Sequence, residues 1–511
     1  MTNRLPWLKM RKKTDPELPL EPPILLGNRS NGEFFLDESP RDRKIRRAIL
    51  QIAADQAPRH GMERREFLAS AMGMAASLYV INLASGCGGS SGGFEVPPPA
   101  SLDCDEATEM LSGDDFILDL QTHHIEDEDT WRDRHPMSEN YTGEVYANFL
   151  TFWDCDLSPR SECIGPRTYT EKIFLDSDTT VAVLSGFPSP MCDDGTLCTN
   201  VNSNDGMAYW RDLFNDAAGS QRMVQHCQVA PNDRWDLQAE NMERVRAAYG
   251  NHGWKCYPPW GPDGAGWWLD DWVVSDPFIK KCKELGEPLI CVHKGFPLPG
   301  FDRVHTDPKD VGPAAVRHPD VNFVIYHSGY EGRIIEGPYD PNGLGVDRLV
   351  KTVLENNLKG KNVYAEMGSA WMLASGNSIG AQHYVGKMLK YLGEDHLLWG
   401  SECVWFGSPQ RQIEAFRRLE ISEEFQEKYG YPALTPEIKA KVFGLNGARL
   451  YGIDPEEVRC SLDTNKLQLA KLELDGTFGK RRWAFEKPGG PRSRREFLNL
   501  ARWRQFVKSP A

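Results

Sequence analysis

Short apolar runs rich in β-branched and aromatic residues recur through the middle of the chain. There are eight of them, at residues 116–120, 180–185, 223–229, 254–257, 288–293, 321–327, 362–367 and 396–401. Segments with helical periodicity lie between several of these runs, at residues 237–249, 272–285, 349–354 and 382–392. Continuous apolar strands that alternate with helices predict a parallel sheet covered on both faces. Eight such units favour a closed α/β barrel, the (β/α)8 or TIM barrel, over an open sheet.

Two long segments interrupt this alternation, at residues 125–178 and 186–219. Both follow predicted strands, which is where barrel enzymes build their active sites. Beyond residue 453 the chain carries a basic tail that contains tryptophan and shows no clear packing pattern. We therefore predict a barrel over residues 103–455 with insertions after its first strands, and an irregular C-terminal tail over residues 456–511.

The first hundred residues have a different character. Residues 1–62 are rich in charge and proline without a sustained apolar period, which predicts a disordered extension. Arg64 and Arg65 then precede an uncharged apolar run over residues 68–86, so residues 63–87 resemble a twin-arginine export signal. A membrane anchor or a buried core helix is the alternative interpretation. Residues 88–102 are rich in glycine and proline and predict a flexible tether.

The apolar run ends at Cys87, in a context that resembles a lipoprotein cleavage site. This predicts an exported bacterial protein, periplasmic or held at the membrane by a lipidated Cys87, with the twin-arginine translocation machinery as a partner. Removing Cys87 from the 12 cysteines leaves an odd number, so a complete disulfide framework is excluded. Short bridges could still pair Cys155 with Cys163 and Cys192 with Cys198 in loop-like stretches.

Charge and hydropathy narrow the class of protein further. The 511 residues carry a formal net charge of −14 without a long basic block in the middle of the chain, which argues against a nucleic-acid partner. A mean hydropathy of −0.51 argues against a polytopic membrane protein. A large soluble globular protein remains, with a small molecule as its expected partner and a homo-oligomer left open.

Side chains of metal-ligand type close four of the predicted strands. Gln121 and His123 end the first run, His293 the fifth, His327 the sixth, and Glu402 the eighth. Strand alternation points Gln121 and His123 to the same side, and the carboxyl ends of barrel strands converge on one mouth. Imidazole nitrogens with a carboxylate are typical of a hydrolytic divalent metal site that keeps one position open for water.

Four further residues near these strand ends are secondary candidates. Glu366 ends the seventh run and is either a partner of the ligands or part of a structural ion pair. Lys255 in the fourth run could bind a substrate carboxylate or simply be paired within the barrel. We assign His226 to the core, and His124 should point away from the mouth by alternation.

In this order the strand ends resemble the amidohydrolase superfamily, and most closely its amidohydrolase-related branch, which includes aminocarboxymuconate-semialdehyde decarboxylase. The resemblance spans about residues 116–453 and rests on residues 119–124, His293, the His-x-Gly at His327, and residues 398–402. It implies one divalent ion, zinc first and manganese or magnesium otherwise, on the barrel. By position it makes His123 and His293 ligands, Glu402 a ligand and base, and His327 the acid that polarises the substrate.

Two residues depart from the family pattern. Gln121 stands where a histidine ligand is usual, and Glu402 stands where an aspartate is usual. An amide oxygen is a poorer zinc donor than imidazole, so metal affinity should fall. Three functions stay open: a metal-dependent hydrolase that attacks a small ester, lactone or amide with a metal-activated water, a non-oxidative decarboxylase of an aromatic or unsaturated acid, and an inactive binding protein without metal.

Overall fold

The computed structural model describes most of the chain. The described residues are 20–27, 29–30, 35–36, 38–86, 92–125, 160–188, 191, 202–262, 264–297, 301–332, 334–481, 484 and 495.

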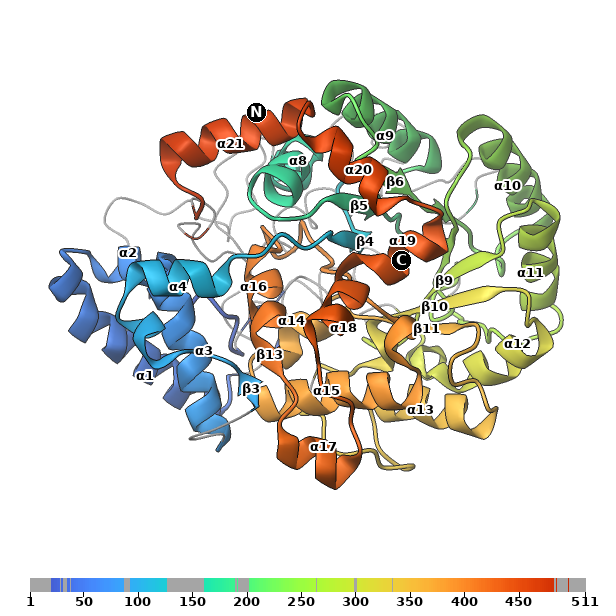
Figure 1. Cartoon of the computed structure of the whole chain (residues 1–511). Helices are drawn as coiled ribbons and strands as arrows, with labels where there is room; N and C mark the ends of the chain where they lie inside the picture. Colours follow the sequence, from blue (N-terminus) through green and yellow to red (C-terminus); the bar gives the residue numbers. More distant parts are fainter. Residues whose placement is uncertain are drawn as a thin grey trace.

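A barrel of parallel strands taken in chain order forms the centre of the molecule (Figure 1). Three strands pair in sequence, namely β4 (Leu118–Thr122), β5 (Val181–Leu184) and β6 (Met223–Gln225). Six more continue the order, namely β7 (Cys227–Gln228), β8 (Trp254–Cys256), β9 (Leu289–His293), β10 (Asn322–Tyr326), β11 (Val363–Glu366) and β12 (Leu397–Leu398). Each predicted run overlaps at least one of these strands.

Two junctions turn the two sheets into one closed barrel. At His226 the chain changes partner, because the His226 amide donates to Leu184 at 2.9 Å and the Cys227 amide donates to Gly253 at 3.0 Å. β6 and β7 therefore occupy one position of the barrel. Between the last strand and the first, the Glu402 amide donates to the Gln121 carbonyl at 2.7 Å. The predicted (β/α)8 barrel is confirmed.

Helices cover the outside of the barrel (Figure 1). The helical segments predicted between the strands are confirmed by α10 (Trp235–Tyr249), α11 (Ser275–Glu284), α13 (Val346–Glu355) and α15 (Ser378–Tyr391). The remaining strand connections carry α8 (Pro166–Thr170), α9 (Asn204–Ala218), α12 (Val311–Arg317), α14 (Ala370–Ala374) and α16 (Gln410–Arg418). The segment predicted as an insertion at residues 186–219 thus contains the barrel helix α9.

The barrel interior at the amino-terminal ends of the strands, called the lower interior below, is an apolar core. Its members come from the strands and from two helices that close this end, α19 (Asn446–Tyr451) and α20 (Pro455–Leu462). They include Leu118, Val183, Val224, Val324 and Leu398, with Tyr451 and Val458 contributed by the closing helices. Packed side chains leave the opposite end of the barrel as the place for chemistry.

The expected disordered extension is partly a folded helical layer. Ser39 caps α1 (Pro40–Gln56) through a reciprocal hydrogen-bonded box with Asp42, and a short 3-10 turn, Ala57–His60, follows. The prediction of disorder over residues 1–62 is therefore wrong for residues 40–60, because Ile45, Ile49 and Ala53 give α1 a buried face. Residues 1–19 lie outside the described part of the chain.

The apolar run predicted as an export signal forms α3 (Ala71–Ser85), which follows α2 (Arg64–Ala69). Met72, Met74 and Leu78 of α3 are fully buried, and the helix packs against α1, α15 and α4 (Cys104–Leu111). Close packing at the α2–α3 corner requires Gly73, because a Cβ there would lie 2.3 Å from the Phe67 carbonyl oxygen. This is the arrangement expected of a buried core helix, and the export signal stays a prediction.

The proposed tether is also partly folded. Strand β3 (Gly93–Phe94) pairs antiparallel with β13 (Leu419–Glu420), and the side chain of Asn82 bonds the backbone of Phe94. The expectation of a flexible tether is therefore wrong over residues 92–102, because this pairing fixes it to the barrel. Cys87 lies outside the described residues. No helix in the described ranges combines the length and apolar character needed to cross a membrane.

Part of the C-terminal tail is likewise ordered against the barrel. Helix α21 (Lys466–Phe478) packs on α9 and on the helical turn Glu171–Leu175. Buried Arg222 donates to Asn465 at 3.2 Å, and Lys471 pairs with Asp178 at 3.2 Å. An irregular tail is thus wrong for residues 456–478, whereas residues beyond 481, apart from 484 and 495, are not described.

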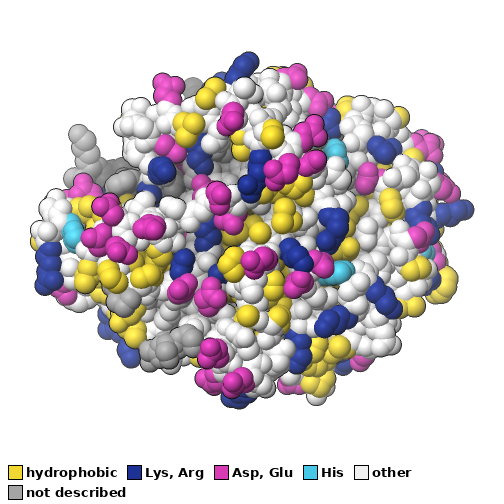
Figure 2. All heavy atoms as spheres, viewed as in Figure 1, with side chains coloured by type: hydrophobic (Ala, Val, Ile, Leu, Met, Phe, Trp, Pro, Cys, Tyr) yellow, Lys and Arg dark blue, Asp and Glu magenta, His cyan; other side chains and the backbone are white. Residues whose placement is uncertain are grey.

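The structure describes only some of the cysteines for which the sequence predicted disulfides. Cys163 is disulfide-bonded to a cysteine outside the described residues. Cys155, Cys192 and Cys198 are also not described, so the two predicted pairs stay predictions. Cys227 and Cys403 are free and buried, as are the other cysteines of the apolar runs. Figure 2 shows acidic and basic side chains interspersed on one face of the molecule, with no broad patch of either sign there.

Candidate functional site

The predicted site residues lie at the carboxyl ends of the strands. Gln121 lies in β4, His293 ends β9, His327 follows β10, and Glu402 follows β12. His123 comes directly after β4. Each of the five residues is at most 2% exposed. Their shared burial means that every polar atom needs a protein partner or a ligand.

Four of these side chains form one contact group. The Gln121 amide nitrogen donates to Glu402 Oε1 at 3.0 Å and lies 3.5 Å from His327 Nε2. His327 Nε2 lies 3.2 Å from His293 Nδ1 and 3.7 Å from Glu402 Oε1. The structure therefore brings together residues from the first, fifth, sixth and eighth barrel positions around the imidazole of His327.

Backbone carbonyls fix where the protons of these imidazoles lie. His327 Nδ1 lies 2.8 Å from the Gly368 carbonyl, and a carbonyl only accepts, so the proton must be on Nδ1. His293 Nε2 faces the Phe296 carbonyl at 3.4 Å, so the same argument places the proton of neutral His293 on Nε2 and leaves its Nδ1 without one. The group that can donate to His327 Nε2 is the Gln121 amide nitrogen, at 3.5 Å. His123 Nδ1 likewise faces the Ser185 carbonyl at 2.7 Å. In this arrangement His327 presents a base at Nε2, whereas the sequence suggested an acid.

Burial keeps these imidazoles neutral. It lowers the pKa of His327 and of His123 to about 3, and the positive charge of Lys255 adds to the shift in both cases. Burial also lowers the pKa of His293 well below its ordinary value, helped by His327 and Lys255. Neutral imidazoles can accept a proton or a cation but cannot serve as standing acids.

Aromatic rings enclose the imidazoles. His123 stacks between Phe187, with ring centroids 5.0 Å apart, and Trp405, at 5.5 Å. His293 packs against Tyr257 at 5.2 Å and Phe301 at 5.3 Å. The His123 ring thus contacts Phe187, Trp405 and the Ser185 carbonyl. The walls that face these histidines are therefore apolar and flat, which suits an organic substrate with an apolar body.

Glu366 ties two strand ends together beside His327. Its carboxylate accepts from the His327 amide at 3.1 Å and from the Gly368 amide at 2.5 Å. Gly400 leaves room for it, because a Cβ there would lie 1.7 Å from Glu366 Oε1. Burial, the dominant cause, raises the pKa of Glu366 to about 8 despite these bonds. Glu366 thus fixes the backbone that carries His327.

Left-handed backbone concentrates at the same strand ends. Phe296, His327, Ser328, Ser369 and Glu402 have φ values of 32°, 64°, 53°, 52° and 58°. Residues other than glycine adopt these angles at a cost that the surroundings must offset, and such residues gather at functional sites. The geometry at the mouth is therefore held against local preference.

Lys255 lies deeper in the barrel, beneath the imidazoles. It pairs in register with Cys291, two residues before His293. Its ammonium lies 3.3 Å from the ring centroid of Tyr326 and 4.9 Å from that of Tyr257. The side chain is fully buried, and Nζ has no hydrogen-bond partner among the described residues. Burial lowers the pKa of Lys255 to about 8, against the opposing effect of nearby acidic groups.

One buried acid escaped the sequence analysis as a functional candidate. Asp119 accepts from the Ser401 amide at 3.0 Å and from the Gln121 amide at 3.2 Å, so it joins the first and last strands beneath the site. Burial raises the pKa of Asp119 to about 6. A charged residue inside a predicted buried strand was the signal that could have identified it.

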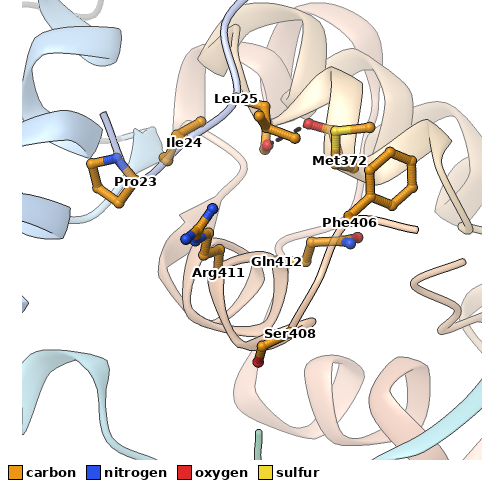
Figure 3. A pocket seen from close by; sticks show the side chains of 9 residues that line it. Pro23, Ile24, Leu25, Met372, Phe406, Ser408, Arg411 and Gln412 are labelled. Carbon is orange, nitrogen blue, oxygen red and sulfur yellow. Dashed lines mark hydrogen bonds between the residues drawn. The ribbon is translucent and has the colours of Figure 1, made fainter. Parts of the chain in front are cut away.

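A small cavity lies to one side of the site. It is lined by Pro23, Ile24 and Leu25 and by residues that follow β11 and β12, including Met372 and Phe406 (Figure 3). Most of its lining is apolar, and the predicted ligands and Glu366 are not among the residues that line it. Residues 23–25 thus pack against residues that follow β11 and β12, without entering the contact group.

Comparisons with known proteins gave one family match and several structural likenesses. Residues 202–453 match the family model described as Amidohydrolase. A TIM-barrel protein from Bordetella bronchiseptica is 14% identical over 66% of this chain and 98% of its own, with a TM-score of 0.42. A 5-carboxyvanillate decarboxylase from Sphingomonas paucimobilis is 13% identical over 66% and 99%, with a TM-score of 0.42.

A second 5-carboxyvanillate decarboxylase, from Novosphingobium aromaticivorans and with bound manganese, is 14% identical over 66% of this chain and 97% of its own, with a TM-score of 0.41. Likenesses of this size do not transfer a substrate or a metal. No curated protein matches the chain.

The predicted ligands do not fit a divalent ion as they are arranged. Among the described residues, no group of three or more His, Cys, Asp or Glu side chains is placed to hold one. Gln121 turns its amide nitrogen, a donor, toward Glu402, and its oxygen is buried without a hydrogen-bond partner in the described part of the chain. His123 lies apart between aromatic rings. A metal held by Gln121, His123, His293 and Glu402 therefore stays a prediction.

Proposed function

Because this chain belongs to the amidohydrolase superfamily, we propose that it is an enzyme that hydrolyses a small ester, lactone or amide at the carboxyl end of its barrel. The observation that carries the proposal is the pair of His327 Nε2 and Glu402 Oε1, 3.7 Å apart and buried. An imidazole whose Nε2 carries no proton, beside a carboxylate, is a general base of the kind that activates water.

The chain's own residues supply each proton step of this proposal. His327 Nε2 takes the proton of the attacking water, and Glu402 stabilises the imidazolium that forms. The same imidazolium then gives its proton to the leaving oxygen or nitrogen. Gln121 holds Glu402 in place through its amide, and Glu366 holds the His327 backbone.

A divalent ion, zinc or manganese, remains an expectation from the family. It would polarise the carbonyl if bound, and Gln121, His123, His293 and Glu402 are the residues predicted to hold it. The described arrangement does not fit it, so no step above uses it. Elemental analysis of the purified full-length protein tests the expectation directly, with a His123→Ala and His293→Ala double variant as the comparison.

Non-oxidative decarboxylation of an aromatic or unsaturated acid is the second candidate. The flat apolar walls formed by Phe187, Trp405, Tyr257 and Phe301 favour it, because they suit a planar substrate. The carbon that loses carbon dioxide would take its proton from the same His327 and Glu402 pair. Release of carbon dioxide from candidate acids separates this reaction from hydrolysis.

Substitution of the carboxylate tests both reactions. Full-length protein is assayed with nitrophenyl esters, aryl lactones and aromatic acids, beside Glu402→Gln and, as a control, Glu284→Gln on the outer helix α11. Loss of about a hundredfold or more in turnover is expected for Glu402→Gln alone. Equal turnover in wild type and Glu402→Gln would overturn the proposal, and no turnover with any substrate would favour a binding protein.

Export by the twin-arginine route is proposed separately, on the motif at Arg64 and Arg65, which are exposed at the start of α2. Lipidation at Cys87 would require the chain to be cut before it, and this would remove α3 from the core in which it packs. The intact mass of protein from a bacterial membrane fraction tests cleavage. A mass that retains residues 1–86 would contradict lipidation and favour a helix kept as part of the fold.

A further inference from the structure

We propose that the floor of the barrel is an anion site, in which the Lys255 ammonium receives the carboxylate of a small organic acid without a bound metal. The inference rests on the proposed function, since it names what the same site recognises. It begins from a disagreement. The family implies a cation held by side chains from three strands, and the described side chains from those strands do not gather around one.

The position of Lys255 makes it the cation of this floor. Its ammonium lies between Tyr326, which precedes His327, and Tyr257, whose ring stacks on His293 at 5.2 Å. Its charge acts on His123, His293 and His327. A positive charge thus already lies beneath His327 and beneath His123 and His293, the two imidazoles that the family resemblance makes metal ligands.

Other fully buried lysines of this chain show what a structural lysine looks like. Lys387 donates to Asp347 at 2.6 Å and also pairs with Glu336. Lys294 donates to Asp310 at 2.7 Å and to two backbone carbonyls at 2.9 and 3.1 Å. Lys255 has only aromatic faces and no hydrogen-bond acceptor among the described residues. A buried ammonium without an acceptor is costly unless a ligand supplies one.

Glu366 and Glu402, the two carboxylates whose charges act on Lys255, make the following hydrogen bonds with other groups. Both oxygens of Glu366 accept backbone amides, at His327 and Gly368, and Glu402 Oε1 accepts the Gln121 amide. None of these three bonds involves Lys255. The acceptor that Lys255 lacks therefore has to come from outside the described residues, and a carboxylate is the small group that matches an ammonium in charge and in hydrogen bonding.

The surroundings define the rest of the ligand. Tyr257, whose ring the Lys255 ammonium faces, packs against Phe301, and both rings contact His293. A ligand with its carboxylate at Lys255 would place its apolar body against these rings and its next carbon near His327. This orientation presents the substrate to the base of the proposed function.

Binding of benzoate to the full-length protein tests the inference. The protein is treated with a chelator, and calorimetry compares benzoate with benzamide, which has the same shape but no charge. We expect benzoate to bind, benzamide to bind about tenfold more weakly or less, and Lys255→Met to weaken benzoate by about tenfold or more. Lys255→Arg should retain part of the affinity. Lys283→Met, on the surface of α11, is the control and should bind like wild type.

Several outcomes would overturn the inference. They are no benzoate binding by wild type, equal affinity for benzoate and benzamide, unchanged benzoate affinity in Lys255→Met, and benzoate binding that requires added manganese. If Lys255→Met fails to fold, the inference is tested by the comparison of benzoate with benzamide and by the Lys255→Arg variant. The binding measurement does not depend on turnover. Charge-selective binding without hydrolysis would therefore reject the proposed function alone. Hydrolysis without Lys255-dependent binding would reject the inference alone.

Discussion

The lower interior of the barrel and its mouth each bury a histidine completely, His226 below and His327 above. His226 bonds Tyr451 from the closing helix α19 through Nε2, and its Nδ1 faces Ser185 Oγ at 3.2 Å. His327 bonds one carbonyl and otherwise faces titratable or amide groups, namely His293, Glu402 and Gln121. Its backbone is also left-handed, with φ of 64°.

The difference lies in the partners and not in the burial. Each ring nitrogen of His226 has a hydroxyl partner, which is the pattern of a structural residue. His327 has one nitrogen fixed by the backbone and the other turned toward a carboxylate and an imidazole. Burial lowers the pKa of both, so a shifted pKa alone would not distinguish them.

The largest effect should come from replacing the histidine at the mouth. His327→Asn removes the unprotonated Nε2 that acts as the base, so turnover should fall by about a hundredfold to ten thousandfold. Stability should change little, because one hydrogen bond to Gly368 is worth about 1 kcal/mol. Steady-state turnover with the best substrate measures the first and chemical denaturation the second. Turnover within about threefold of wild type would remove His327 from the mechanism.

Glu366 next to His327 predicts a dependence of stability on pH. The folded-state pKa of Glu366 is about 8, above the ordinary value of 4.5, because burial disfavours its charge. Between these values the folded state keeps a proton that the unfolded state has lost, so the free energy of unfolding falls as pH rises from 4.5 to 8.

The slope can reach about 1.4 kcal/mol per pH unit for one such group. Glu366→Gln cannot titrate and should show a flatter profile in urea unfolding between pH 5 and pH 8. A wild-type profile that runs parallel to that of Glu366→Gln across this window would contradict the shift.

His226 in the lower interior should affect stability instead of turnover. His226→Asn leaves Tyr451, Ser185 and Cys291 without their shared partner, which should cost about 2 kcal/mol in the free energy of unfolding. Turnover per folded molecule should match wild type. A loss of turnover comparable to that of His327→Asn would show that the two histidines act together, and the comparison above would fail.

The barrel could be predicted from the sequence because each of its strands is a continuous apolar run buried on both sides. The sequence also located Gln121, His293, His327 and Glu402, because the carboxyl ends of parallel strands must converge. It could not show that Gln121 donates to Glu402, since an amide has both a donor and an acceptor end and only the packed neighbours choose between them. Partners distant in sequence decided this.

The helical layer before the barrel was missed for a related reason. The charges of α1 suggested disorder, although Ile45, Ile49 and Ala53 recur at helical spacing and lie buried against α3. The uncharged run of α3 suggested a signal, because a short sequence window does not reveal whether an apolar helix meets lipid or protein. The barrel helix α15, far along the chain, supplies the protein surface.

The smallest effect should come from the tyrosine that reaches His226 from below. Tyr451→Phe keeps the ring in the apolar core and removes only the hydroxyl that bonds His226, so the free energy of unfolding should fall by about 1 kcal/mol. Turnover should not change, because the mouth keeps all its partners. Tyr209→Phe, on an exposed ring, is the control and should leave stability unaltered. A change in turnover with Tyr451→Phe would mean that the hydrogen bonds of the lower interior set the geometry of the mouth, through the neighbouring contact of Tyr326 with His226.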